Sequence, residues 1–157
     1  MRNFLTYTSF INEYRSTLIG RVEYVEFPGV GQISAKVDTG NWQYNSLHGY
    51  DFIEEGKSIS FTTVNDTRLT LPIIKKINVK TSIDKIDSED SGTIKNRVEN
   101  LTPDRPVVEL EFVMGGKKYK EKFSISDRSR MKYPILLSAG FLKDHNFIVD
   151  PNKTFIL

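Results

Sequence analysis

The clearest alternation of apolar and polar residues lies between residues 31 and 40. Ile33, Ala35 and Val37 alternate with polar neighbours, which is the spacing of a strand that buries one face. The alternation ends in the tripeptide Asp38-Thr39-Gly40, a carboxylate, a hydroxyl and a glycine. The pattern therefore predicts a strand that delivers one carboxylate to a tight turn.

Other segments alternate in the same way and predict a mainly β chain. Val107 to Met114 alternates cleanly, Gly115-Gly116 is a two-residue hairpin signal, and an apolar face continues on the return strand to Ile125. The further predicted strands are Leu18 to Phe27, closed by a turn at Pro28 to Gly31; Ile59 to Val64 and Arg68 to Ile74, paired around Asn65 to Thr67; and Tyr133 to Leu137.

The two ends of the chain carry different patterns. Asn3 to Arg15 places apolar residues at spacings of three and four, which predicts a short amphipathic helix. We expect residues 1–17 to form an arm that packs on the domain or on a neighbouring molecule. At the other end, Phe141 to Asn146 predicts a brief helix or turn, and the chain then continues as strand, turn and strand to Leu157.

Composition fits one domain, residues 18–157, and narrows the function classes. The 157 residues include no cysteine, which removes disulfides and thiolate chemistry. Basic and acidic residues number 22 and 20 and are interspersed, so no charge field favours nucleic acid. With no long apolar run and no secretion signal, we expect a cytoplasmic protein without membrane partners.

Several segments, taken in order, resemble a known family. Val37-Asp38-Thr39-Gly40 is similar to the catalytic loop of pepsin-type aspartic proteases, and Tyr133 to Leu142 resembles the segment that crosses behind that loop in retropepsins. Together with Arg105 to Leu110 and Ser126 to Pro134, they resemble the bacterial and phage family labelled "putative ATP-dependent zinc protease". The resemblance implies a closed retropepsin-like β-barrel with one short C-terminal helix, working as a homodimer.

The resemblance also implies roles for particular residues. Asp38, Thr39 and Gly40 would be catalytic: two Asp38 carboxylates, one from each chain, would share a proton and activate water against an amide bond. The residues expected at the substrate are Asn41, His48, Arg128 and Arg130. Relatives that act with an ATP-grasp glutamate ligase imply a substrate bond between glutamates added to a ribosomal protein.

The zinc in the family label finds little support in the residues. The chain has two histidines, His48 and His145, and they lack the helical spacing of a catalytic zinc site. We therefore expect no metal and no cofactor. Packing or surface roles for His48, and a turn-stabilising ion pair for the charges of Asp127, Arg128 and Arg130, are the structural alternatives.

Two segments compete for the flap that covers the cleft in retropepsins. One is the hairpin around Asn65 to Thr67, and the other lies in the polar stretch Thr81 to Asp104, which we favour.

Ser138 stands where the family has glycine, close to the catalytic loop, and Asn41 stands where a small residue is usual. These two residues motivate a second hypothesis, a retropepsin-fold binding or assembly module with reduced or lost activity, for instance a phage virion component. A different small β-barrel, with Asp38 in a structural turn, is the alternative fold.

Overall fold

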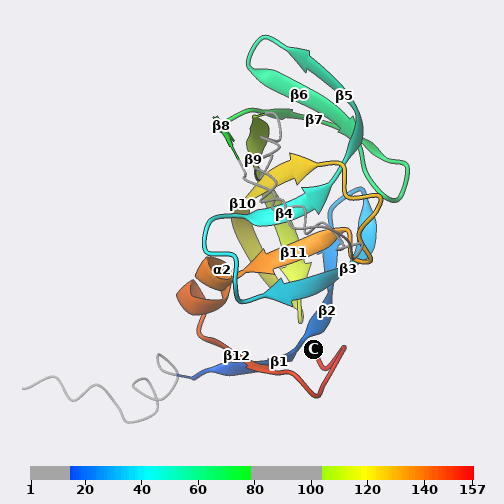
Figure 1. Cartoon of the computed structure of the whole chain (residues 1–157). Coiled ribbons are helices and arrows are strands. Elements are labelled where there is room, and N and C mark those ends of the chain that lie inside the picture. Colours follow the sequence, from blue (N-terminus) through cyan, green and yellow to red (C-terminus); the bar gives the residue numbers. More distant parts are fainter. Residues whose placement is uncertain (1–14, 79–103) are drawn as a thin grey trace, which may run out of the picture.

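Twelve strands and one short helix make up the part of the chain that the structure, a computed structural model, describes: residues 15–78 and 104–157 (Figure 1). The predicted N-terminal helix and the favoured flap segment lie outside these residues. The elements are β1 (Thr17–Gly20), β2 (Val22–Phe27), β3 (Gly31–Asp38), β4 (Asn45–His48), β5 (Tyr50–Glu55), β6 (Ser58–Thr62), β7 (Arg68–Pro72), β8 (Lys75–Ile77), β9 (Arg105–Met114), β10 (Lys117–Ser126), β11 (Ile135–Ser138), α2 (Ala139–Asp144) and β12 (Phe147–Asp150).

Six strands close into a barrel, which confirms the predicted mainly β class. They follow the order β10-β4-β11-β3-β2-β9, and β9 pairs back with β10. The β9–β10 hairpin turns at Gly115 and Gly116, whose φ angles of 58° and 76° suit glycine. On β9 the predicted apolar face is buried, with Val108 and Phe112 at most 1% exposed. The barrel interior is therefore the hydrophobic core.

The segment predicted as one strand from Leu18 to Phe27 is two strands, and the single-strand prediction is wrong. The chain bends at Arg21, between the two strands, and β1 pairs in parallel with β12 instead of joining the barrel sheet. A side chain at Gly20 would meet the carbonyl oxygen of Lys153 at 2.6 Å. The bend is held by Arg21, whose N–H donates to that same carbonyl at 2.8 Å.

A separate three-stranded sheet, β5-β6-β7, stands at one end of the barrel (Figure 1). Its β6–β7 hairpin turns through Asn65, Asp66 and Thr67, as predicted. Strand β8 instead joins the barrel sheet and pairs antiparallel with β9, with Ile77 opposite Arg105. The favoured flap segment follows β8 and precedes β9 in the sequence. Because nearly all of it lies outside the described residues, the choice of flap stays a prediction.

The C-terminal residues lie against the barrel without forming the predicted strand. Phe155 has a φ of 53°, which interrupts an extended run, and its N–H donates to the Val22 carbonyl at 2.8 Å. The carboxylate of Glu23, 1% exposed, accepts N–H groups from Gly20 at 2.7 Å, Ile156 at 3.2 Å and Leu157 at 3.3 Å. One buried acid thus fastens the last residues to the bend after β1.

We expect Glu23→Gln to destabilise the fold by about 1–3 kcal/mol, because an amide NH2 cannot accept the backbone hydrogen bonds that a carboxylate oxygen accepts. Urea unfolding measures the change. Glu26→Gln, on the exposed face of the same strand, is the matched control. An equal loss in both variants would contradict this role of Glu23.

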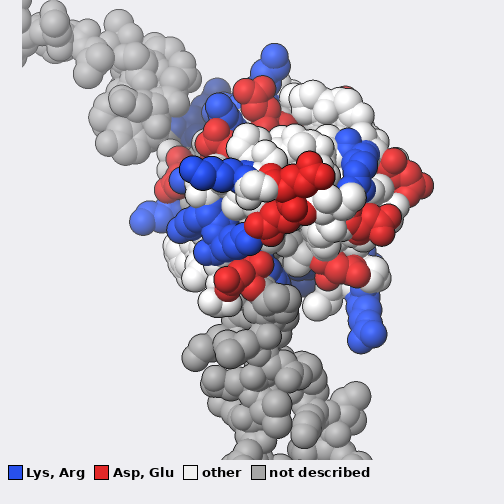
Figure 2. Space-filling view, turned by 90° about the horizontal axis from the view of Figure 1, so that it is seen from above, with Lys and Arg blue, Asp and Glu red and all other residues white. Residues whose placement is uncertain are grey.

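Charge on the surface is mixed. On the face seen in Figure 2, Lys and Arg side chains lie among Asp and Glu side chains, and neither sign dominates. None of the helices that the structure describes is long and apolar enough to cross a membrane.

Candidate active site

The candidate active site is the loop that leaves β3 and returns as β4. Strand β11 lies between β3 and β4, parallel to the first and antiparallel to the second. Ser138, the last residue of β11, stands in register with Asp38, the last residue of β3. The loop therefore crosses the end of a third strand, and Asp38 sits at the crossing.

Local hydrogen bonds shape the Asp38-Thr39-Gly40 turn. The N–H of Gly40 donates to Asp38 Oδ1 at 3.2 Å, and the N–H of Asn41 donates to the Asp38 carbonyl at 3.2 Å. Asp38 is partly buried, whereas Thr39 and Gly40 are exposed. The turn holds the carboxylate at the surface of the barrel with the threonine open to solvent.

Two asparagines fasten the connection between β3 and β4 to the end of β11 and the start of α2. The Asn41 carbonyl accepts the N–H of Ala139 at 2.7 Å, and Asn45 Oδ1 accepts the N–H of Ser138 at 2.8 Å. Asn45 is only 2% exposed, so this side chain belongs to the framework rather than to the surface. Asn41, predicted at the substrate, uses its own amide within the loop, where it donates to the Tyr44 carbonyl at 3.0 Å.

Ser138 caps the helix that follows it. Its hydroxyl accepts the N–H of Phe141 at 3.2 Å and forms the N-cap of α2, a position that favours serine over glycine only slightly and over alanine strongly. Ser138 is 2% exposed. The serine hydroxyl, which a glycine at this position would lack, is thus hydrogen-bonded to the first turn of α2.

We expect Ser138→Ala to lower stability by about 0.5–2 kcal/mol through loss of this cap, and to leave peptide cleavage intact. Thermal unfolding and a cleavage assay on the same preparations measure the two effects. A large gain of cleavage in the variant would show instead that the hydroxyl obstructs the site.

Arg128 is the predicted substrate residue on whose guanidinium the charge of Asp38 acts. Burial lowers the pKa of its guanidinium from the usual value, the nearby charge of Arg105 lowers this pKa further, and the Asp38 carboxylate acts in the opposite direction. Burial also lowers the pKa of Arg105. Both groups remain charged at neutral pH, so Arg128 lies within electrostatic reach of a second cation, Arg105, and of the Asp38 carboxylate.

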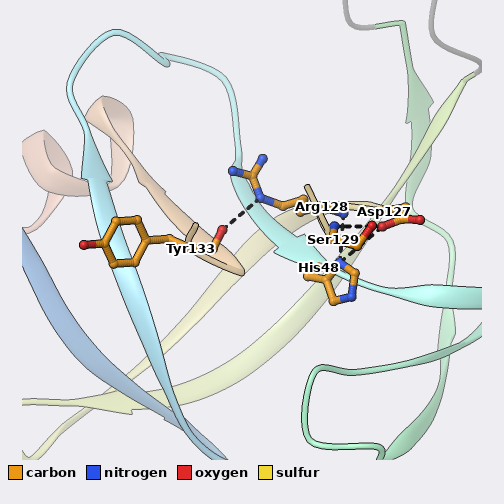
Figure 3. Close-up of polar contacts among 5 residues, drawn as sticks. All are labelled: His48, Asp127, Arg128, Ser129 and Tyr133. Atoms are coloured by element: carbon orange, nitrogen blue, oxygen red, sulfur yellow. Dashed lines mark hydrogen bonds and ion pairs between the residues drawn. The ribbon is translucent and has the colours of Figure 1, made fainter. Parts of the chain in front are cut away.

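Arg128 belongs to a loop, residues 127–134, which we call the arginine loop. Asp127 Oδ1 accepts the N–H of Ser129 at 2.8 Å, and this bond is the main cause of a lowered pKa of Asp127. Arg128 donates from Nε to the Tyr133 carbonyl at 3.4 Å (Figure 3). Arg130, the other predicted arginine, is exposed and acts electrostatically on Asp127.

His48 lies beneath the arginine loop. It is 8% exposed, and its Nδ1 accepts the backbone N–H of Arg128 at 2.8 Å (Figure 3). His145 bonds Glu121 at 2.7 Å. Among the residues that the structure describes, no three His, Asp or Glu side chains gather where they could hold a metal ion.

Two residues of this arrangement did not stand out in the sequence. Arg105 is the first residue of the segment Arg105 to Leu110, whose resemblance to the family assigns this residue no role. Asn45 is one of several polar residues in the stretch that follows Gly40. A cue existed for Arg105, since it opens the long alternating strand β9. No local cue distinguishes Asn45, because its role depends on β11, far away in the sequence.

A cavity of about 330 Å³ opens beside the loop, on the side of Trp42 and Phe141. Asp38 does not line it.

A closed single-lobed barrel with an Asp-Thr-Gly loop crossing a third strand defines the class of retropepsin-like aspartic peptidases. The chain belongs to the RimB-like family within it, since the family described as "Retropepsin-like aspartic endopeptidase RimB" matches residues 18–157. A crystal structure of a protein of unknown function from Legionella pneumophila is similar, with 27% identity and a TM-score of 0.67 over 90% of this chain and 98% of that one. No curated protein matches.

Proposed function

We propose that the protein is an aspartic peptidase whose two catalytic carboxylates are the Asp38 side chains of a homodimer. The observation that carries the proposal is the position of Asp38 at the end of β3, where the loop crosses β11 with Thr39 exposed. A single chain supplies one such carboxylate. A second copy facing it would supply the other and give the Thr39 hydroxyl a partner across the two loops.

In the proposed dimer the two Asp38 carboxyl groups share one proton, because two neighbouring carboxyl groups cannot both be ionised. The ionised Asp38 takes a proton from a water molecule, whose oxygen attacks the amide carbonyl carbon. The protonated Asp38 donates its proton to the carbonyl oxygen. The resulting tetrahedral intermediate collapses with transfer of a proton to the amide nitrogen, the C–N bond breaks, and an acid and an amine leave.

The charges of Arg128 and Arg105 support an acidic substrate. Arg128 and Arg105 are two partly buried cations whose mutual repulsion a bound carboxylate would relieve. A guanidinium binds carboxylates through two parallel hydrogen bonds. The proposed substrate is accordingly a peptide or protein tail rich in glutamate, with Arg128 at the acidic side chain nearest the bond that is cut.

The proposed dyad makes activity depend on dimerisation. Light scattering after size exclusion, over a series of protein concentrations, gives the fraction of dimer, and specific cleavage activity should follow that fraction. A protein that stays monomeric at every concentration and cleaves with constant specific activity would rule out a shared dyad. A stable dimer that cleaves neither glutamate-rich nor generic peptides would favour the binding or assembly module.

A further inference from the structure

His48 lies beside the candidate active site and takes no part in the chemical steps proposed above. Its ring is buried under the arginine loop and stacks on Tyr50 with centroids 5.8 Å apart. Nδ1 lies 2.8 Å from the backbone nitrogen of Arg128 and 3.7 Å from Asp127 Oδ1 (Figure 3). One ring atom therefore faces both a backbone donor and a carboxylate acceptor.

The bond to Arg128 fixes the protonation state of the ring. An N–H group can donate to Nδ1 only when that nitrogen carries a free lone pair, so the ring must be neutral with its proton on Nε2. A protonated ring carries hydrogen on both nitrogens. Its Nδ1–H would confront the N–H of Arg128, and the acceptor within reach would be the Asp127 carboxylate.

His48 also secures the far end of the arginine loop. Its backbone N–H donates to the Pro134 carbonyl at 2.7 Å. The next residue, Gly49, donates to the Ser126 carbonyl at 3.1 Å, and an added Cβ there would approach Phe61 to 2.7 Å. The histidine is thus held in place by its own backbone while its side chain holds Arg128.

We propose that neutral His48 is a positioning residue for substrate recognition. By accepting the backbone N–H of Arg128 it holds this part of the arginine loop in place, and with it the guanidinium, which binds an acidic group of the substrate. The inference rests on the proposed function. When His48 is protonated, its Nδ1–H donates to the Asp127 carboxylate and no longer accepts the Arg128 N–H. The released arginine loop then binds acidic substrates less tightly.

The charged groups around the ring are consistent with this exchange. Asp127 faces Nδ1 from the arginine loop, Arg128 presents its backbone there, and Tyr50 covers the ring from β5. The backbone hydrogen bond from Ser129 is the main cause of the lowered pKa of Asp127, and the charge of Arg130 lowers this pKa further. Asp127 is therefore an ionised acceptor at neutral pH.

The test measures binding of a triglutamate peptide by calorimetry, with Asp38→Asn in every protein so that no peptide is cut. His48→Leu should weaken binding by about tenfold, the value of about one hydrogen bond. His48→Asn should restore most of the affinity, because the amide oxygen of the new side chain can accept the Arg128 N–H. Lowering the pH far enough to protonate the ring should weaken binding in the protein with His48, and much less in the His48→Asn protein, whose amide does not titrate.

Each outcome decides one of the two proposals. Equal affinities in the His48→Leu and His48→Asn proteins, or the same pH dependence with histidine and asparagine, would overturn the positioning role even if the wild type cleaves peptides. The expected binding pattern in a protein whose wild type cleaves nothing would refute the peptidase and keep the positioning role. No triglutamate binding by any form would overturn the inference. If His48→Leu fails to fold, the pH comparison of wild type with His48→Asn still decides.

Discussion

Asp38→Asn should lower the rate of peptide cleavage by about 10³-fold or more while the protein stays folded and dimeric. Asparagine keeps the shape of the side chain and can still accept the Gly40 N–H at Oδ1, the bond that shapes the turn. It cannot take a proton from water at any working pH. The loss should therefore appear in kcat, and the variant should unfold at the same temperature as the wild type.

The matched control for that loss is Asp144→Asn, an exposed acid at the end of α2. It removes the same charge from the same chain and should cleave at the wild-type rate. Cleavage assays on glutamate-rich and generic peptides, from acidic to neutral pH, measure both variants. Equal activity in wild type and Asp38→Asn would leave Asp38 as a structural turn residue.

Arg128→Met should raise KM for glutamate-containing peptides by about 10- to 100-fold, the range expected when a hydrogen-bonded charge partner is removed. Methionine retains much of the partly buried stem and lacks the guanidinium on which the charge of Asp38 acts. KM for neutral peptides should change little, because those substrates have no carboxylate to lose. The split between acidic and neutral substrates separates recognition from a general defect.

Arg130→Met supplies the comparison, since Arg130 lies two residues away and is exposed. A solvent-exposed charge contributes little free energy to an ion pair with the substrate. KM for acidic peptides should therefore change by less than about threefold. Circular dichroism on both variants checks the fold. A larger effect at Arg130 than at Arg128 would place the acidic group of the substrate on the outer side of the arginine loop.

The parts of the fold predicted from sequence are those whose signal is local. Strands β3, β9 and β10 carry their own alternation, and the turn at Gly115-Gly116 lies inside one hairpin. Asp38 was predicted for the same reason, because a strand and its turn stand in ten consecutive residues. The family resemblance added the closed barrel, which no single segment specifies.

The parts that sequence did not predict depend on partners far along the chain. Strand β4 is only four residues long, and three of them are polar, yet all four are buried because β10 and β11 flank it on both edges. The break between β1 and β2 depends on Lys153, more than a hundred residues later. The contact of His48 with Arg128 spans 80 residues, so its sequence neighbours carry no trace of it.

Mixed dimers test the shared dyad most directly. Wild type and Asp38→Asn chains are combined at varied ratios, allowed to exchange, and assayed at constant total protein. If each active site needs Asp38 from both chains, activity should follow the square of the wild-type fraction, about one quarter at equal mixing. Activity that falls in direct proportion, to about one half at equal mixing, would show that each chain acts alone and would contradict the shared dyad.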